Sequence, residues 1–312
     1  MNPLEALRAR ARRSLYEYDG RTGRAIARVF ADPLPVPLLD VAALAMAQEL
    51  ARALTLDPAR VRRLLAAAQA RGAVPVAVVG DSHSTHLVRR ALRDGRWLLP
   101  LHLLCTGASA RGLANPAAAA GAGAKVRELL AELPPMPTAF MFGQVDVEFV
   151  HAFKRLETGV GAFDADEFDA FAEETVGRYI ALLAEASPKG LKPLVRVATI
   201  FPPALSDAAW RQGYVNAHIA HLHGPADLAG LGELQIPSLA QRTRLHARFN
   251  TRLAAAARAA EFGVLDLFEP LLGGKGTVKR SLLGRAQGAN HHLGYGASRR
   301  PLVEAMWGMV GP

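Results

Sequence analysis

Short apolar runs alternate with amphipathic segments along most of this chain. The first run, 74–79, reads Val-Pro-Val-Ala-Val-Val and ends at Gly80. Apolar runs of this kind are typical of strands that are buried on both faces of a parallel sheet. Similar runs occupy 98–105, 138–142, 194–201 and 263–268. The pattern therefore predicts five buried strands.

Segments with helical periodicity lie between these runs. We predict helices over 84–94, 116–133, 166–187 and 238–261. In the last of them Leu245, Phe249 and Leu253 share one apolar face, and Ser238 is placed to cap its start. Strands that alternate with helices predict an α/β fold, in which helices cover both faces of a five-stranded parallel sheet.

The first 72 residues contain no such apolar run. Helical patterns cover 4–14 and 22–30, and Asp40 is placed as the N-cap of a helix that reaches about Leu54. A further helix follows Asp57-Pro58 and ends near Arg71-Gly72. We therefore expect a helical extension over 1–72 and an α/β domain over 73–312. The extension could cover the active site or join two copies of the chain.

Composition narrows the choice of partners. The net charge is +9 and aromatic residues make up 6% of the 312 residues, but the arginines are spread singly, so we expect no nucleic-acid partner. No apolar stretch is long enough for a membrane helix, so we expect no membrane partner. The single cysteine, Cys105, excludes a disulfide within the chain and fits a reducing compartment, so we expect a cytoplasmic protein.

Candidate chemistry lies directly after the strands, where open parallel sheets bind their ligands. Ser82 follows the first strand in Gly80-Asp81-Ser82-His83-Ser84. At a strand-to-helix turn, a serine activated by a histidine can act as a nucleophile, and backbone N–H groups there can stabilise an oxyanion. The alternative is that Ser82 only caps the predicted helix.

The loops after the second and third strands add further candidates. Gly107 lets the backbone approach a substrate closely, although the simpler interpretation is a tight turn. Gln144 offers an amide donor. Asp146 offers a carboxylate, with a helix cap or a surface position as its alternative.

Adjacent histidines stand in Asn290-His291-His292-Leu293-Gly294, ahead of the last predicted helix. They could ligate a metal, but neighbours on an extended chain point in opposite directions, so we expect only one of them to face the site. A second histidine cluster, at His218, His221 and His223, has no cysteine or carboxylate to complete a metal site. We therefore expect neither a metal nor another cofactor.

The order of these motifs over about 73–312 resembles the SGNH (GDSL-like) hydrolase superfamily. Gly80-Asp81-Ser82-His83 resembles its first block, 107–109 its second, 143–146 its third and His292-Leu293-Gly294 its histidine block. The resemblance implies a flavodoxin-like α/β/α sandwich with Ser82 as nucleophile, His292 as base and Gly107 as an oxyanion donor. It also implies an esterase or deacylase that forms an acyl-enzyme with a small acylated metabolite or an O-acylated sugar.

Two positions depart from the family pattern. Val145 stands where the third block has an oxyanion-binding asparagine, so Gln144 is the expected substitute. Ala289 stands where an acid precedes the histidine, which leaves a Ser–His dyad or a more distant acid such as Asp146. A Gly-Glu-Ile-Asp third block, which Gly-Gln-Val-Asp resembles, occurs in one branch of the superfamily.

These departures keep two alternatives to hydrolysis open. The same acyl-enzyme could serve an acyltransferase, or the domain could be a catalytically degenerate binding protein. Around the nucleophile we expect Asp81, His83, Asn290, His291 and His151 to contact substrate. For His83 a partly buried structural position is the alternative, and His151 could instead face water.

Overall fold

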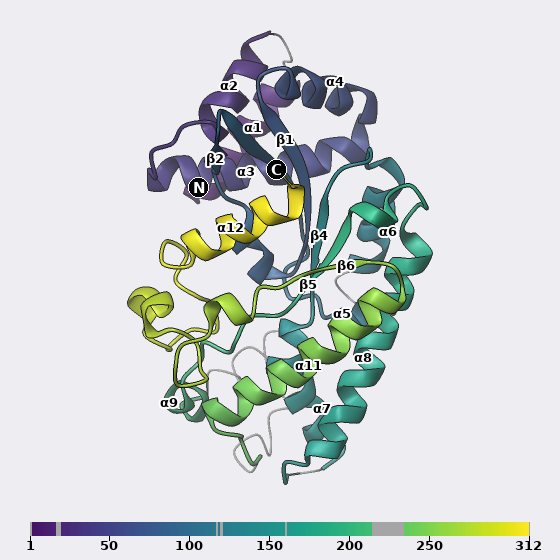
Figure 1. Cartoon of the computed structure of the whole chain (residues 1–312), viewed down its shortest axis with the longest axis vertical. Coiled ribbons are helices and arrows are strands. Elements are labelled where there is room, and N and C mark those ends of the chain that lie inside the picture. The colour runs from purple at the N-terminus through teal and green to yellow at the C-terminus, as the bar shows by residue number, and fades with distance from the viewer. Residues whose placement is uncertain are drawn as a thin grey trace.

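The computed structural model describes residues 2–16, 20–116, 118, 121–159, 161–213 and 234–311. Its centre is one six-stranded sheet with the order β2-β3-β1-β4-β5-β6 (Figure 1). The strands are β1 (Ala73–Gly80), β2 (Leu92–Arg93), β3 (Arg96–Leu104), β4 (Thr138–Met141), β5 (Val195–Ala198) and β6 (Gly263–Leu265). All five predicted apolar runs thus contain a strand.

The sheet is mixed rather than purely parallel, which corrects the expected five-stranded parallel sheet. Strands β3, β1, β4, β5 and β6 pair in parallel, but β2 pairs antiparallel with β3 at the sheet edge. Asp94-Gly95 forms the turn that connects β2 to β3, and both residues have positive φ, 51° and 75°. Two-residue turns of this kind favour Asp-Gly because their backbone twist matches that of the flanking strands.

The predicted helix over 84–94 is also wrong. A 3₁₀ turn, η1 (Ser82–Leu87), follows β1, and the backbone becomes extended at Val88 (φ −85°, ψ 94°). The chain then runs along the edge of the sheet. The backbone N–H of Leu98 donates to the carbonyl of Ala91, and the next residues form β2, which pairs with β3. Pairing with the sheet therefore overrides the helical pattern of this segment.

Helices surround the sheet, and the longest agree with prediction. They are α5 (Ala110–Leu113), α6 (Ala122–Glu132), α7 (His151–Glu157), α8 (Ala165–Ala186), α9 (Asp207–Arg211), α11 (Leu239–Ala259) and α12 (Arg299–Val310). Short turns are η2 (Asp146–Val150, π-helical), η3 (Lys192–Leu194), η6 (Glu269–Leu271) and η7 (Arg280–Ala286). Ser238 caps α11 with a reciprocal bond to Gln241, as the capping pattern predicts.

The first 72 residues form helices that pack directly on the sheet. They are α1 (Pro3–Tyr16), α2 (Gly20–Phe30), α3 (Pro37–Leu56) and α4 (Pro58–Gln69), gathered at one end of the molecule (Figure 1). Phe30 stacks on Trp97 of β3 with ring centroids 6.2 Å apart. Asp40 lies inside the first turn of α3 rather than at its N-cap, because Pro37 begins that helix. These helices and the sheet share one hydrophobic core.

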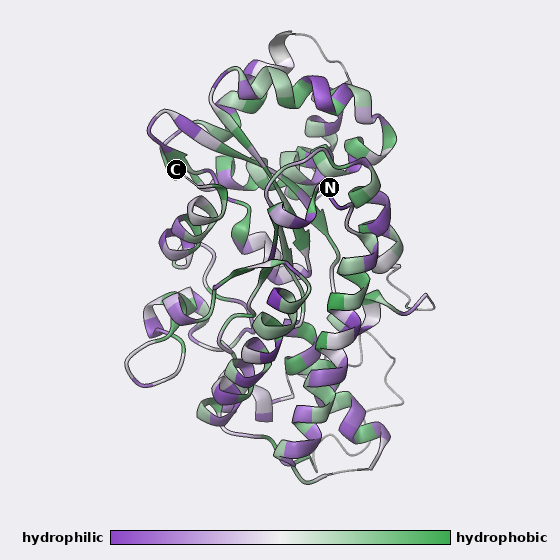
Figure 2. Ribbon diagram, turned by 45° about the vertical axis from the view of Figure 1, so that its right-hand side comes forward, coloured by the Kyte–Doolittle hydropathy of each residue, from purple (hydrophilic) through white to green (hydrophobic). Residues whose placement is uncertain are grey.

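Apolar residues concentrate where the helices meet the sheet, and charged residues lie mostly on the outer faces of the helices (Figure 2). Leu34, between α2 and α3, and Leu38, in the first turn of α3, are exceptions that stay exposed. The expected contact between copies through the N-terminal helices remains a prediction. None of the helices in the described part of the chain combines the length and apolar character that a membrane span needs.

Candidate active site

Three strands end in register and bring their following loops together. Gly80 of β1 is paired with Leu104 of β3 on one side and with Met141 of β4 on the other. Strand order reverses here, because the second parallel strand lies on one side of the first and the third lies on the other. Ligands in open α/β sheets bind at such reversal points, outside the carboxyl ends of the strands.

Gly80 is required by this close approach. A Cβ built at this position would lie 2.4 Å from the carbonyl oxygen of Met141 and 2.6 Å from Cβ of Ser84. Real side chains do not tolerate such distances to a backbone atom, so only glycine lets β1 turn sharply beside the end of β4. Ser82 therefore sits at the start of a tight turn at the reversal point.

Two residues that the sequence predicted as partners do meet here. The Oγ of Ser82 lies 3.3 Å from Nε2 of His292. Both side chains are half-buried. Asp81 caps the turn by accepting the backbone N–H of His83 at 2.8 Å, which fixes where the Ser82 side chain leaves the backbone. A serine and a histidine at this distance can exchange a proton.

Asp81 and His83 form a buried pair behind this turn. Oδ1 of Asp81 lies 3.0 Å from Nδ1 of His83, and neither side chain is exposed. Burial lowers the pKa of His83, but the Asp81 charge and hydrogen bond outweigh it and the pKa lies above the ordinary 6.5. The expectation that both residues contact substrate is wrong, because full burial leaves them to brace the turn.

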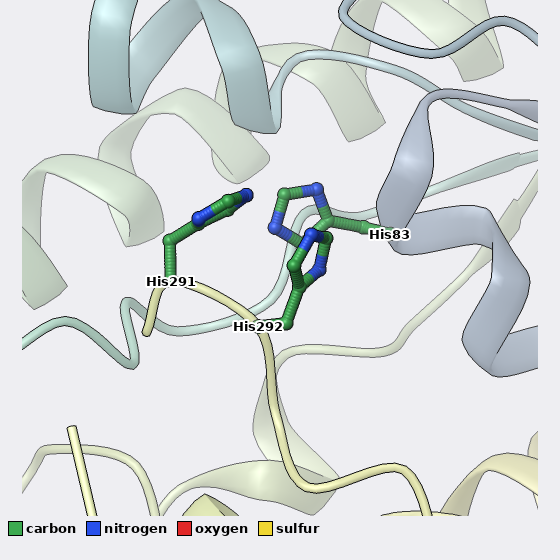
Figure 3. A group of neighbouring side chains, drawn as sticks. All are labelled: His83, His291 and His292. Carbon is green, nitrogen blue, oxygen red and sulfur yellow. The ribbon is translucent and has the colours of Figure 1, made fainter. Parts of the chain in front are cut away.

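His291 and His292 lie in the loop before α12, and both rings point toward His83 (Figure 3). Their ring centroids are 4.0 Å apart. This corrects the expectation that only one would face the site. The reason is local: Asn290 Oδ1 accepts the backbone N–H of His292 at 3.0 Å, and this turn replaces the extended conformation. Asn290 shapes the loop in this way, where we expected it to contact substrate.

Asp146 serves the second loop rather than His292. Its carboxylate accepts the backbone N–H groups of Ala110 at 2.6 Å and of Arg111 at 3.0 Å, at the start of α5. Burial raises the pKa of Asp146 to about 6, against the effect of these two bonds. The expected role as a triad acid is therefore corrected: Asp146 anchors the segment that follows Gly107, whose φ of 70° suits glycine.

The side-chain amide of Gln144 is hydrogen-bonded to the loop that follows β5. Its Oε1 accepts the backbone N–H of Phe201 at 2.9 Å, and its Nε2 donates to Oε1 of Glu148 at 2.8 Å. The side chain is buried. It cannot also serve as the oxyanion donor we expected, because its amide is committed to holding the loop after β5.

His151 lies outside the site. Its ring packs 5.1 Å from those of both Phe168 and Phe171, and its Nε2 lies 2.8 Å from Glu167. The predicted contact of His151 with substrate is therefore wrong, because α8 encloses the ring. His218, His221 and His223 lie outside the described residues.

Two further buried residues support the site, and the sequence did not predict their contacts. Glu148 is 3% exposed, and burial raises its pKa to about 6. Its spacing of four from Gln144 was the available signal, because such residues meet on one helical face. Asn250 of α11 holds Ile200 through both backbone groups, at 2.8 and 2.9 Å, and no local pattern indicates this contact.

Comparison of the chain with protein-family models, with curated proteins and with solved structures found no match. A functional assignment therefore depends on the geometry around Ser82.

Proposed function

We propose that this protein is a serine hydrolase that cleaves small carboxylic esters through an acyl-enzyme on Ser82. The observation that carries the proposal is the 3.3 Å separation of Ser82 Oγ and His292 Nε2 at the carboxyl end of β1. A hydroxyl is a weak nucleophile until a neighbouring base takes its proton, and histidine is the usual base.

The strand order supports the kinship that the sequence motifs suggest. The parallel strands, numbered among themselves in chain order, run 2-1-3-4-5, which is the flavodoxin-like order. Such sheets place a ligand at the junction of their first and third strands. The loops of Ser82 and Gln144 flank that junction, in agreement with an SGNH-type α/β/α sandwich with an added antiparallel edge strand.

The proposed reaction proceeds in two balanced halves. The Ser82 hydroxyl gives its proton to Nε2 of His292 while Oγ bonds to the ester carbonyl carbon, and the leaving alcohol departs with that proton. Water then gives a proton to His292 and bonds to the acyl carbon. The bond from Oγ to that carbon breaks, the carboxylic acid leaves, and His292 returns the proton to Ser82. This is the general serine–histidine scheme.

Backbone N–H groups are the proposed oxyanion donors. In the described part of the chain, neither the N–H of Ser82 nor that of Gly107 donates a hydrogen bond to another residue. Both follow strands that end side by side at Gly80 and Leu104. A pair of such donors typically supplies the largest single contribution to acyl-transfer catalysis. The Gln144 side chain has no part in this proposal.

Covalent labelling and turnover test the proposal together. We expect a fluorophosphonate probe to modify the peptide that contains Ser82, and p-nitrophenyl acetate to be hydrolysed. Ser82→Ala should abolish both. Ser238→Ala, at the exposed N-cap of α11, is the matched serine control and should retain both. Undiminished turnover in Ser82→Ala would refute the assignment. Added alcohols, with product analysis, distinguish hydrolysis from acyl transfer.

A further inference from the structure

Three imidazoles converge beside the proposed nucleophile. The ring of His83 lies 4.3 Å from that of His292 and 5.1 Å from that of His291, centroid to centroid. One ring nitrogen of each residue lies within 4.8 Å of the corresponding nitrogens of the other two. The rings approach one another from two segments far apart in the chain, η1 and the loop before α12 (Figure 3).

His83 is prepared as a ligand by its buried partner. In the neutral form of His83, the Asp81 carboxylate accepts the Nδ1–H, and the lone pair is then on Nε2. Metal-binding histidines usually donate their other ring N–H to a carboxylate or carbonyl, which fixes the tautomer and the orientation of the ring. His83 Nε2 is buried and makes no well-formed hydrogen bond within the described part of the chain, although the backbone of His291 lies near enough to help raise the pKa of this ring.

Aromatic packing alone does not account for this cluster. His291 packs edge-on against Phe149 with centroids 5.2 Å apart, and a phenylalanine could make the same contact. A buried ring nitrogen without a partner costs about 1–3 kcal/mol, which phenylalanine would avoid. A ligand on Nε2 of His83 would give this buried nitrogen a partner, and a histidine would then be favoured over phenylalanine at this position.

The surrounding charge favours a cation. Asp81 is fully buried against His83, and the Glu148 carboxylate lies close enough for its charge to act on the same ring. Oε2 of Glu148 is also buried without a hydrogen-bond partner in the described part of the chain. The two carboxylates carry the charge opposite to that of a divalent ion, and such an ion would take the place of the proton that Asp81 favours on His83.

We propose that His83, His291 and His292 bind a divalent metal ion of the zinc class, and that the bound ion switches off Ser82. Three histidines with an open fourth position are an established zinc ligand set, and closing the nitrogens onto Zn–N bonds of about 2.1 Å needs shifts of about 1 Å. Binding uses imidazole lone pairs, releases water from the ion and sends to solvent the proton that His83 carries when charged, and nothing is oxidised or reduced.

Inhibition follows whichever nitrogen of His292 the ion takes, and this half of the inference rests on the proposed function. Coordination through Nε2 occupies the lone pair that would receive the Ser82 proton. Coordination through Nδ1 leaves the proton on Nε2, which can then only donate. In both cases the base 3.3 Å from Ser82 is lost.

Zinc binding is measured without reference to activity. Isothermal titration of the full-length protein with ZnCl₂ should give one site with a dissociation constant below about 1 μM. His291→Phe, which keeps the ring packing, should weaken binding at least 100-fold, and Asp81→Asn roughly 10- to 100-fold. Ser82→Ala should bind as the parent does. His151→Ala, and joint replacement of His218, His221 and His223 by alanine, are the histidine controls and should also bind normally.

Absence of binding, or unchanged binding in His291→Phe with a native circular dichroism spectrum, would overturn the metal site. Turnover of p-nitrophenyl acetate should fall in proportion to zinc occupancy and return with EDTA. Activity that instead requires zinc would overturn the switch. If no ester is turned over even with EDTA, the proposed function fails, while the titration still decides the metal site.

Discussion

Ser82 Oγ lies 3.3 Å from Nε2 of His292, a residue 210 positions further along the chain. The contact depends on two separate turns. Asp81 caps the turn that begins at Ser82, and Asn290 closes the turn that presents His292. Because each turn is held by its own side chain, the serine and the histidine are positioned before a substrate binds.

His292→Ala should lower kcat for p-nitrophenyl acetate by about 100- to 10,000-fold, because the proton of Ser82 then has no base. KM should change less, since the ring acts on the reacting proton. Steady-state kinetics with EDTA present measures both. Retention of more than half of kcat would show that another group activates Ser82.

Gln144→Leu should destabilise the fold by about 2 kcal/mol, because the Phe201 N–H and the Glu148 carboxylate each lose a buried hydrogen-bond partner. Urea unfolding measures the loss. Gln241→Leu, which removes an exposed capping-box partner, is the matched control and should cost less. Equal losses in the two variants would contradict the assignment of Gln144 as the clamp of the loop after β5.

The strands were predictable because a buried parallel strand is marked by its own apolar run. The sequence did not predict the true structure of 84–94, because the helical periodicity of this segment competes with pairing to β3. Asp94-Gly95 was the turn signal that indicated the hairpin. The sixth strand follows from the same turn. The motif order placed Ser82, Gly107 and the His291-His292 pair at one edge of the sheet, and the strand register brings the first two loops together.

The sequence did not predict the directions in which the side chains of the site point. Gln144 bonds to Phe201, 57 positions later, and Asp146 bonds to Ala110, 36 positions earlier. Such partners are set by the packing of whole elements. Asp81 and His83 flank the nucleophile in sequence, yet the 3₁₀ turn buries both. The pairing of His291 with His292 depended on one side-chain bond from Asn290.

Arg90→Met should destabilise the protein by about 3 kcal/mol, because it leaves the partly buried carboxylate of Asp32 without its cation and leaves Asp40 with Arg299 alone. The Arg90 side chain is fully buried, and its guanidinium lies 3.2 Å from Asp32 and 3.8 Å from Asp40. Arg93→Met is the control: the Arg93 side chain is 42% exposed beside Glu304, and exposed ion pairs contribute about 0–1 kcal/mol. Similar thermal unfolding of the two variants would show that the contact does not secure α3 to the rest of the fold.

Asp146→Asn should reveal a pH-dependent cost of burying this carboxylate. The folded pKa is about 6 and the ordinary value is 3.8, so between these values the folded protein holds a proton that the unfolded chain releases. The contribution of Asp146 to the free energy of unfolding is therefore largest below about pH 4. It falls as the pH rises to about 6 and stays constant at higher pH. The total fall is roughly 3 kcal/mol, at about 1.4 kcal/mol for each pKa unit.

Urea unfolding of both proteins at pH 4 and pH 7 isolates this effect. Glu148, whose pKa burial also raises to about 6, gives a fall of the same sign in both proteins and cancels in the difference. The stability of the parent relative to Asp146→Asn should therefore decrease by roughly 1–3 kcal/mol between the two pH values. Asp94→Asn, which changes an exposed carboxylate in the hairpin, is the control. A difference that stays constant or increases with pH would mean that the bonds to Ala110 and Arg111, which favour the charged form, outweigh burial.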